Sequence, residues 1–346
     1  MSETMISPTP ILIGLIILVA LAFDFMNGFH DSANAISTVV STKVLSPRQA
    51  VLFAASFNFV AAFTFGVAVA STISNLVKLD YVPITSIPWI HLAALIGAIG
   101  WNVATWYLGL PTSSSHAIIG GLLGAGIASS GVAAIKLSTV IFVVIFMVLS
   151  PVIGMTIGFL FMVGVLWLAK ETHRSKVDTY FRKLQLFSAG AYSFSHGSND
   201  AQKTMGIITP LLFSIGYFGT RVNPDLLPVP IWVILAAHTA IALGTLSGGW
   251  RIVRTMGYKI TRLRPVDGFA AESASAATII SASLAGIPVS TTHIITSSIM
   301  GVGTTRGTSA VKWGMARSII WAWFLTIPVS ALIGYTSFSL IAHVLP

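Results

Sequence analysis

Apolar stretches recur along almost the whole chain, each bounded by proline, glycine or charged residues. They cover residues 11–42, 49–72, 89–110, 115–135, 138–169, 187–218, 229–249, 269–287, 292–303 and 316–342. A membrane-spanning helix needs about 20 nearly uncharged residues, and a piece such as 292–303 is too short to cross about 30 Å of hydrocarbon. No alternating strand pattern recurs. The sequence therefore predicts an all-α polytopic membrane protein of roughly 10–12 spans, with broken helices and re-entrant helical hairpins.

Charged residues make up only 8% of the chain, against 55% hydrophobic residues. The formal net charge of +9 is therefore explained by Lys and Arg in short cytoplasmic loops that contact anionic membrane lipid, and not by nucleic-acid binding. The chain has no Cys, which excludes disulfides, thiolate metal sites and thiol nucleophiles. The first apolar stretch has neither a basic flank nor a cleavage site, so we expect a first span rather than a removed signal.

Two sequence motifs each occur twice, in the same order. FMNGFHDSANA at residues 25–35 aligns with FSHGSNDAQKT at residues 194–204, at an offset of 169. GLPTSSSH at residues 109–116 aligns with GIPVSTTH at residues 286–293, at an offset of 177. Chance is a poor explanation for two motifs repeated in register, so we expect a duplicated architecture.

The most charged segment, KETHRSKVDTYFRK, lies near the middle of the chain. We expect a first membrane repeat at residues 1–169, a basic cytoplasmic linker at 170–187 and a second, inverted membrane repeat at 188–346. The inversion is inferred from charge: the loop at 251–264 is strongly basic, whereas its first-half equivalent at about 72–88 carries only one Lys and one Asp. Repeats of the same orientation should have basic loops at equivalent positions.

The first repeated motif places polar side chains three or four residues apart, on one face of a helix. In the first half these are Asp24, Asn27, Asp31 and Asn34, and in the second half Ser193, His196, Asp200 and Lys203. A carboxylate at the centre of a membrane helix costs about 2.5–3.5 kcal/mol, so it usually faces a cavity, an ion or a partner charge. We predict cation-coupling roles for Asp31, Asn34, Asp200 and Asn199, with Asp31, Asn34 and Asp200 as metal ligands. Alternatively, Asp200 only neutralises Lys203.

The second repeated motif has the residues of a turn followed by a helix start: Gly, Pro and then hydroxyl side chains. The exposed backbone N–H groups and the positive dipole end of such a helix bind anions, and the hydroxyls add donors. Two such helix starts meeting near the membrane midplane would enclose a tetrahedral oxyanion; otherwise the hydroxyls only cap and pack helices. The predicted substrate-binding residues are Ser113, Ser114, Ser115, Ser290, Thr291, Thr292, Lys203 and Gln202.

Four more side chains are candidates for gating or proton transfer: Asp24, His116, His293 and Glu272. His116 and His293 each end a hydroxyl motif, where a histidine more often packs or caps. Glu272 has no acidic partner in the first half, which favours a role in coupling or gating, or else a position at the membrane interface near Asp267. Because an anion and membrane-embedded carboxylates repel one another, cations must accompany the anion. Symport with Na⁺ or H⁺ follows, and no other cofactor is expected.

The four motifs NGFHDSANA, SHGSNDAQK, GLPTSSSH and GIPVSTTH resemble the duplicated signatures of the inorganic phosphate transporter (PiT) family, over nearly the whole chain. The resemblance implies an inverted-repeat carrier that takes up phosphate with Na⁺ or H⁺, often as a homodimer, with the Asp-bearing repeats and hydroxyl-rich hairpins lining the site. The first motif departs from the common GANDxAN form, because His30 precedes the Asp where Asn is common. We expect an integral protein of the plasma (inner) membrane of a prokaryote.

Three alternatives stay open at this point. A sulfate symporter of the same family would use the same hydroxyls, although phosphate keeps an O–H donor that a carboxylate can accept, whereas sulfate does not. An uncoupled anion channel could use the same helix-tip site, but channels need weak serial sites rather than one enclosed site. An intramembrane enzyme is disfavoured, since no H-E-x-x-H motif and no G-x-S-x-G motif with partners occurs.

Overall fold

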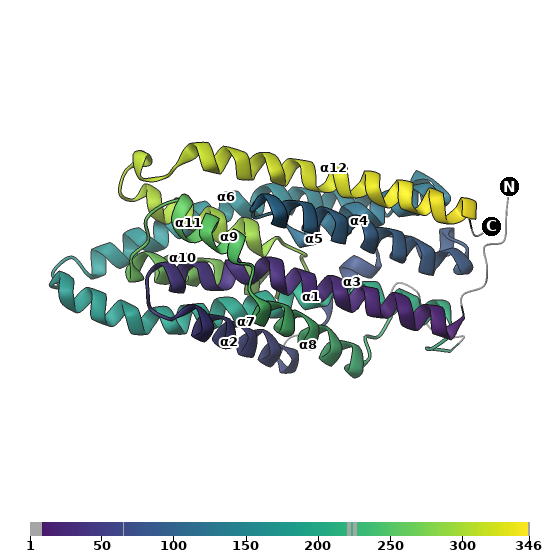
Figure 1. The fold of residues 1–346 in the computed structure, drawn as a ribbon, viewed down its shortest axis with the longest axis horizontal. Coiled ribbons are helices and arrows are strands. Elements are labelled where there is room, and N and C mark those ends of the chain that lie inside the picture. The colour runs from purple at the N-terminus through teal and green to yellow at the C-terminus, as the bar shows by residue number, and fades with distance from the viewer. Residues whose placement is uncertain (1–8, 65, 220–222, 224–226, 345–346) are drawn as a thin grey trace.

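The computed structural model describes residues 9–64, 66–219, 223 and 227–344, and within them it shows helices packed side by side along one long axis, without a β-strand (Figure 1). The α-helices are α1 Pro10–Ser41, α2 Pro47–Val60, α3 Ala68–Ser74, α4 Ile87–Leu108, α5 Ser114–Ser130, α6 Leu137–Leu168, α7 Arg174–Ser214, α8 Ile231–Ser247, α9 Trp250–Arg254, α10 Pro265–Leu284, α11 Thr291–Thr304 and α12 Trp313–Val344. The predicted all-α class is confirmed.

Four of the described helices are long and apolar enough to cross a membrane: α1, α6 and α12, and α4 with the short turn before it. Two bent helix pairs raise this number to six if each pair is one broken span. Helices α5 and α11, of 17 and 14 residues, are too short for the criterion, as re-entrant helices would be. The large exposed apolar side chains of α6 and α12 form surfaces suited to lipid.

Two hairpins, α4–α5 and α10–α11, hold the hydroxyl-rich motifs. Gly109 ends α4 with φ of 66°, and Gly286 follows α10 with φ of 68°, a left-handed conformation that glycine adopts without strain. The next helix of each hairpin begins with a capping serine: Ser113 accepts a hydrogen bond from the backbone N–H of His116 at 3.2 Å, and Ser290 from that of His293 at 3.1 Å. The predicted turn and helix start are confirmed in both motifs.

The order of helices in the first half is repeated in the second, and the two halves exchange packing partners. Helix α5 packs against α12 as α11 packs against α6, and α1 packs against α8 as α2 packs against α7. Helix α1 runs away from the end of the molecule that holds the N-terminus, whereas α7 runs towards that end (Figure 1). The halves are therefore interleaved rather than separate bodies.

The expected linker at residues 170–187 is mostly helical, and the expected boundary at residue 187 falls inside α7. Helix α7 begins at Arg174, where the preceding His173 accepts a hydrogen bond from the backbone N–H of Ser175. An ion pair at 3.0 Å between Arg182 and Asp178, one turn apart, supports the exposed first turns. A run of charged residues fits both a loop and a helix that extends out of the membrane. The charge alone therefore did not predict the helical start of α7.

The basic residues of several loops gather at one end of the molecule. Arg182, near the start of α7, donates a hydrogen bond at 3.0 Å to the carbonyl of Lys43, in the turn after α1. At the start of α10, Asp267 pairs with Arg264 at 3.1 Å and with Arg306 at 3.3 Å. Since Gln185 of α7 contacts Glu272 of α10, these starts lie side by side. By the positive-inside rule we expect this end to face the cytoplasm.

Close packing of α5 against α12 depends on small residues, and this generates a first prediction. A Cβ added at Gly124 would collide with the carbonyl oxygen of Ala331 in α12. We expect Gly124→Ala to lower the stability of the folded protein by about 1–3 kcal/mol, because the two helices must move apart. Thermal unfolding of the purified protein measures this. Gly164→Ala is the matched control, since a Cβ there meets nothing within 4 Å; equal melting temperatures for both variants would contradict the prediction.

Candidate functional site

The N-termini of α5 and α11 meet inside the protein. We call Ser113–Ser115 and Ser290–Thr292 the two hydroxyl tips. The Ser115 hydroxyl donates a hydrogen bond at 3.4 Å to the carbonyl of Val289, the residue before the second tip. The rings of His116 and His293, one residue after each tip, lie 4.7 Å apart between centroids. The expectation that the two tips lie together therefore agrees with the structure.

The carboxylates of the two Asp-bearing motifs lie next to the hydroxyl tips. Atoms of Asp31 on α1 and of His196 and Asp200 on α7 all lie within 4.8 Å of one another and could hold a metal ion. All three side chains are buried. The second tip touches both acids: Thr292 donates to Asp31 and Thr291 donates to Asp200, each at 3.2 Å. We call Asp31, His196 and Asp200 the acid cluster.

Lys203 joins the acid cluster to the first tip. Its Nζ lies 2.5 Å from Oδ1 of Asp200, donates to the carbonyl of Val289 at 3.0 Å, and also donates to the Ser115 hydroxyl. The side chain is only 1% exposed, which is unusual for a lysine without a partner charge. Lys203 thus neutralises Asp200, as the alternative interpretation of the sequence proposed, and it does so at the hydroxyl tips.

Asn34 contributes an amide to the first-half side of the site. Its Nδ2 donates a hydrogen bond at 2.8 Å to the Thr292 hydroxyl, while its buried Oδ1 has no hydrogen-bond partner among the described residues. Asp31 is flanked by His30, whose Nδ1 lies 3.0 Å from Oδ1 of the carboxylate. Carboxylate, amide and hydroxyl oxygens together form a set of ligands suited to a hard cation.

The hydroxyls of the two tips are used differently. Ser113 and Ser290 cap their helices, and Ser115, Thr291 and Thr292 bind the acids, the lysine or a carbonyl. The buried hydroxyl of Ser114 has no hydrogen-bond partner within the described chain. The first backbone N–H groups of each helix have no intrahelical acceptor. The tips therefore present hydroxyl and backbone N–H donors with which an oxyanion can form hydrogen bonds.

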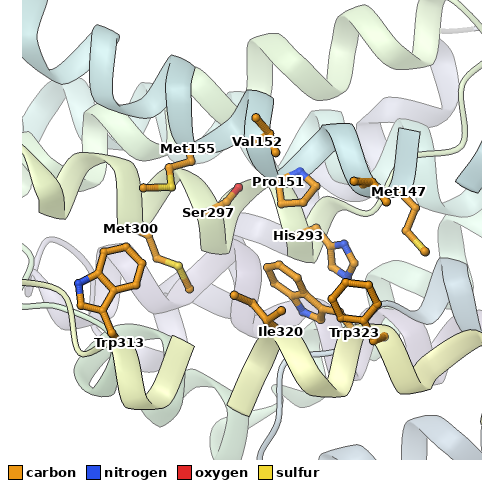
Figure 2. A pocket seen from close by; sticks show the side chains of 12 residues that line it. Met147, Pro151, Val152, Met155, His293, Ser297, Met300, Trp313, Ile320 and Trp323 are labelled. Atoms are coloured by element: carbon orange, nitrogen blue, oxygen red, sulfur yellow. The ribbon is translucent and has the colours of Figure 1, made fainter. Parts of the chain in front are cut away.

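His293 lines an apolar pocket rather than the polar site. The pocket has a volume of about 280 Å³ and lies between α6 and α12. Figure 2 shows the His293 ring in it, with methionine side chains around it. The ring is stacked on Trp323, with centroids 3.9 Å apart. The ring nitrogens of His116 and His293 have no hydrogen-bond partner in the described residues. This position favours packing of the hairpin tips, although a gating or proton role for His116 and His293 stays a prediction.

Two predicted site residues on α7 form their hydrogen bonds with residues outside the hydroxyl tips. Gln202 accepts a hydrogen bond at 2.9 Å from the N–H of Val69 at the start of α3, and it donates at 2.6 Å to the carbonyl of Ser198. Two residues along a helix turn a side chain by about 200° from Asp200, so these contacts favour a structural role, and the substrate contact of Gln202 stays a prediction. Asn199 donates to Ser283 at 2.8 Å, which attaches it to α10.

Glu272 and Asp24 are buried but lie outside the acid cluster. Glu272 accepts hydrogen bonds from Ser188 at 2.5 Å and from Gln185 at 3.1 Å, so it ties α10 to α7 and is not a solvent-exposed interface residue. Asp24 lies two helical turns before Asp31 on α1, and no ion pair joins it to another described residue. Their gating roles stay predictions.

The sequence places His196 on the polar face of α7, but the predicted cation-coupling residues do not include it. Its Nε2 lies 3.3 Å from Asp200 and 4.0 Å from Asp31, so it bridges acids from two helices. The signal was available, because His196 precedes Asp200 by one turn on the same face. Tyr192, one turn earlier again, donates at 3.4 Å to the carbonyl of Thr291 and was not considered.

Comparison with known proteins identifies the family of this chain. The profile of the Phosphate transporter family matches residues 27–334. The chain belongs to the phosphate transporter family. As a member of it, the chain is a membrane transporter and not an enzyme. It is 52% identical to a "Probable low-affinity inorganic phosphate transporter" of Rhizobium meliloti, covering 94% of each chain. A protein of the same description from Bacillus subtilis is 46% identical, covering 92% of this chain and 94% of that one.

A solved structure has the same fold as this family member. It is described as "The sodium-dependent phosphate transporter", superimposes with a TM-score of 0.87 and is 25% identical, covering 96% of this chain and 99% of that one. The resemblance inferred from the four motifs is thus confirmed at the level of the family and of the fold.

The contacts of Gln202 generate a second prediction, which separates a capping role from a substrate-binding role. We expect Gln202→Met to destabilise the transporter by about 0.5–2 kcal/mol, because the N–H groups at the start of α3 lose their acceptor. Its affinity for phosphate should stay within twofold of the unmodified protein. Thermal unfolding and equilibrium binding of radiolabelled phosphate measure the two effects. A large loss of phosphate affinity at unchanged stability would support the predicted contact of Gln202 with the substrate.

Proposed function

We propose that this protein is a secondary active symporter that imports inorganic phosphate together with Na⁺ or H⁺ across the plasma membrane of a prokaryote. The observation that carries the proposal is the meeting of two hydroxyl tips beside buried acids from both halves. Family membership and the names of the relatives agree with phosphate as the substrate. The solved relative, which is named as sodium-dependent, gives Na⁺ as a precedent for the coupling ion.

The electrostatics of the site support the transport of cations together with the anion. Orphan N–H groups, hydroxyls and the positive ends of α5 and α11 attract an oxyanion. Asp31 and Asp200 repel it and are themselves costly at membrane depth unless a positive charge is near. Lys203 supplies one such charge beside Asp200. Among the described residues, Asp31 contacts the imidazoles of His30 and His196 and accepts a hydrogen bond from Thr292, so a mobile Na⁺ or proton there would complete the charge balance.

Phosphate suits this arrangement better than sulfate. At neutral pH phosphate keeps at least one O–H group, which can donate to a carboxylate, whereas sulfate can only accept. Carboxylates of both halves lie at the tips, where an all-acceptor ion would meet them without a compensating hydrogen bond. Sulfate transport is therefore the second candidate and serves as the comparison substrate in the experiment below.

Alternating access follows from an inverted arrangement of the halves. Helices α1 and α7 run in opposite directions and carry the equivalent acids (Figure 1). Each half also packs on the last helix of the other, α5 on α12 and α11 on α6. In such a fold, movement of one repeat against the other opens the central site to one side of the membrane at a time.

A polar pocket of about 410 Å³ offers a route from the outer side. It is lined by residues of α3, α6 and the α10–α11 turn, among them Thr72, Lys136 and Gly286. Lys136 precedes α6, whose other end leads to the basic, cytoplasmic start of α7. The pocket therefore lies at the opposite end from the basic loops. It borders the second hydroxyl motif, since Thr72 donates at 2.7 Å to the carbonyl of Gly286.

Uptake by reconstituted proteoliposomes tests the proposal. Radiolabelled phosphate and sulfate are supplied with Na⁺ gradients, H⁺ gradients and membrane potential imposed separately. We expect accumulation of phosphate above its external concentration under one of the cation gradients. Phosphate that only equilibrates under every gradient would indicate a channel. Preferential accumulation of sulfate would overturn the substrate assignment.

Asp31→Asn gives the third prediction. If one co-transported positive charge is lost, steady-state accumulation of phosphate driven by a 100 mV potential should fall at least about 50-fold, because moving a unit charge through that potential supplies about 2.3 kcal/mol. Exchange of internal for external phosphate in the absence of gradients reports whether the anion site remains. Asp80→Asn, which removes an exposed carboxylate in the loop after α3, is the matched control. If the Asp31→Asn variant accumulates phosphate as the unmodified protein does, Asp31 has no role in coupling.

A further inference from the structure

The two repeats carry different side chains three residues after their aligned acids. The offset of 169 that aligns Asp31 with Asp200 also aligns Asn34 with Lys203. Both acids are buried at the hydroxyl tips, and both Asn34 and Lys203 follow their acid by three residues on the same helix face. A neutral amide in the first half is thus replaced by an ammonium group in the second.

The contacts of the Lys203 ammonium are those that a bound cation would make. Its three N–H donors meet three oxygens: the Asp200 carboxylate, the Ser115 hydroxyl and the Val289 carbonyl. Carboxylate, hydroxyl and backbone carbonyl oxygens at broken helices are the usual ligands of Na⁺ in transporters of this type. The ammonium also lies at the tip itself, where its charge acts on an anion held between the two tips.

The equivalent place in the first half has the oxygens but no ammonium. The offset of 177 between the hydroxyl motifs makes Thr292 the counterpart of Ser115, and Thr292 accepts a hydrogen bond from Asn34 as Ser115 accepts one from Lys203. Thr292 also donates to Asp31 at 3.2 Å. Asn34 donates to Thr292 through Nδ2, and its buried Oδ1 has no hydrogen-bond partner within the described residues. An unpartnered buried oxygen beside a carboxylate indicates a ligand that the protein does not supply.

We propose that the ammonium group of Lys203 is a built-in cation that fills the second of two symmetry-related cation sites. Only the first site, at Asp31, Asn34 and Thr292, then takes up a mobile cation. A phosphate transporter with asparagine at both positions would carry one more cation for each phosphate. The inference rests on the proposed symport and names a residue that sets its cation stoichiometry.

The energetics of buried charge explain why the substitution would change ion binding. Removing one partner of a buried ion pair leaves an uncompensated charge, which is strongly destabilising. In Lys203→Asn the carboxylate of Asp200 would lose its ammonium but keep its oxygen neighbours, and the new amide would add another oxygen. The protein can then recover the lost stability by binding Na⁺ in the place of the ammonium.

Binding of ²²Na⁺ to the purified protein, in the presence of phosphate, gives the fourth prediction. Lys203→Asn and Lys203→Gln should each bind one Na⁺ more per chain than the unmodified protein. Lys203→Arg is the matched control: it keeps the positive charge and should bind no additional Na⁺. Melting temperatures in NaCl and in choline chloride of equal concentration provide a second readout, in which only the Asn and Gln variants are stabilised specifically by Na⁺.

An unchanged Na⁺ count in both Lys203→Asn and Lys203→Gln would overturn the inference, as would their failure to fold in NaCl as well as in choline chloride. Weaker phosphate binding without additional Na⁺ would show instead that Lys203 only contacts the anion. Failure of the inference can be distinguished from failure of the proposed symport. The symport fails if the unmodified protein does not accumulate phosphate in proteoliposomes. In vesicles, the variants that gain a Na⁺ should need a Na⁺ gradient for phosphate accumulation and should show a steeper dependence on Na⁺ concentration.

Discussion

The structure depends on burying two carboxylates where two helix N-termini meet. Asp31 and Asp200 are excluded from solvent, so each requires positive charge or several donors nearby. The second hydroxyl tip donates to both acids, and Lys203 pairs with one of them. The same donors and charges that make the acids tolerable also make the site attractive to an oxyanion. Stability of the fold and the proposed binding of the substrate therefore depend on the same groups.

Much of this arrangement could be predicted from the sequence because it follows from local periodicity. The three- and four-residue spacing of polar residues identified the helix face that carries Asp31 and Asp200, and the Gly-x-Pro turns identified the starts of α5 and α11. Pairing the two motifs required only their repetition. These signals are strong because an apolar helix in a membrane has few reasons to contain a polar residue.

The remaining parts depend on which partner a side chain meets, and local pattern does not determine that. Gln202 lies next to the site in sequence, yet it caps α3, a helix from the other half of the chain. His196 becomes a bridge only because α1 and α7 approach each other. The charged start of α7 was expected to be a linker, since its exposed polar side chains fit a loop and an extramembrane helix equally well.

Because the halves are interleaved, the proposed movement of one repeat against the other would displace groups of the site. Each hydroxyl tip belongs to a hairpin whose second helix packs on the last helix of the other half, through contacts as close as that of Gly124 with Ala331. A hairpin cannot shift without altering the distance between tip and acid, because Lys203 bonds to Ser115 of one half and to the Val289 carbonyl of the other. In a symmetric carrier a mobile ion would make this connection and leave with the anion. In the proposed assignment the Lys203 ammonium stays on α7 beside Asp200, so the cation cycle belongs to the first half.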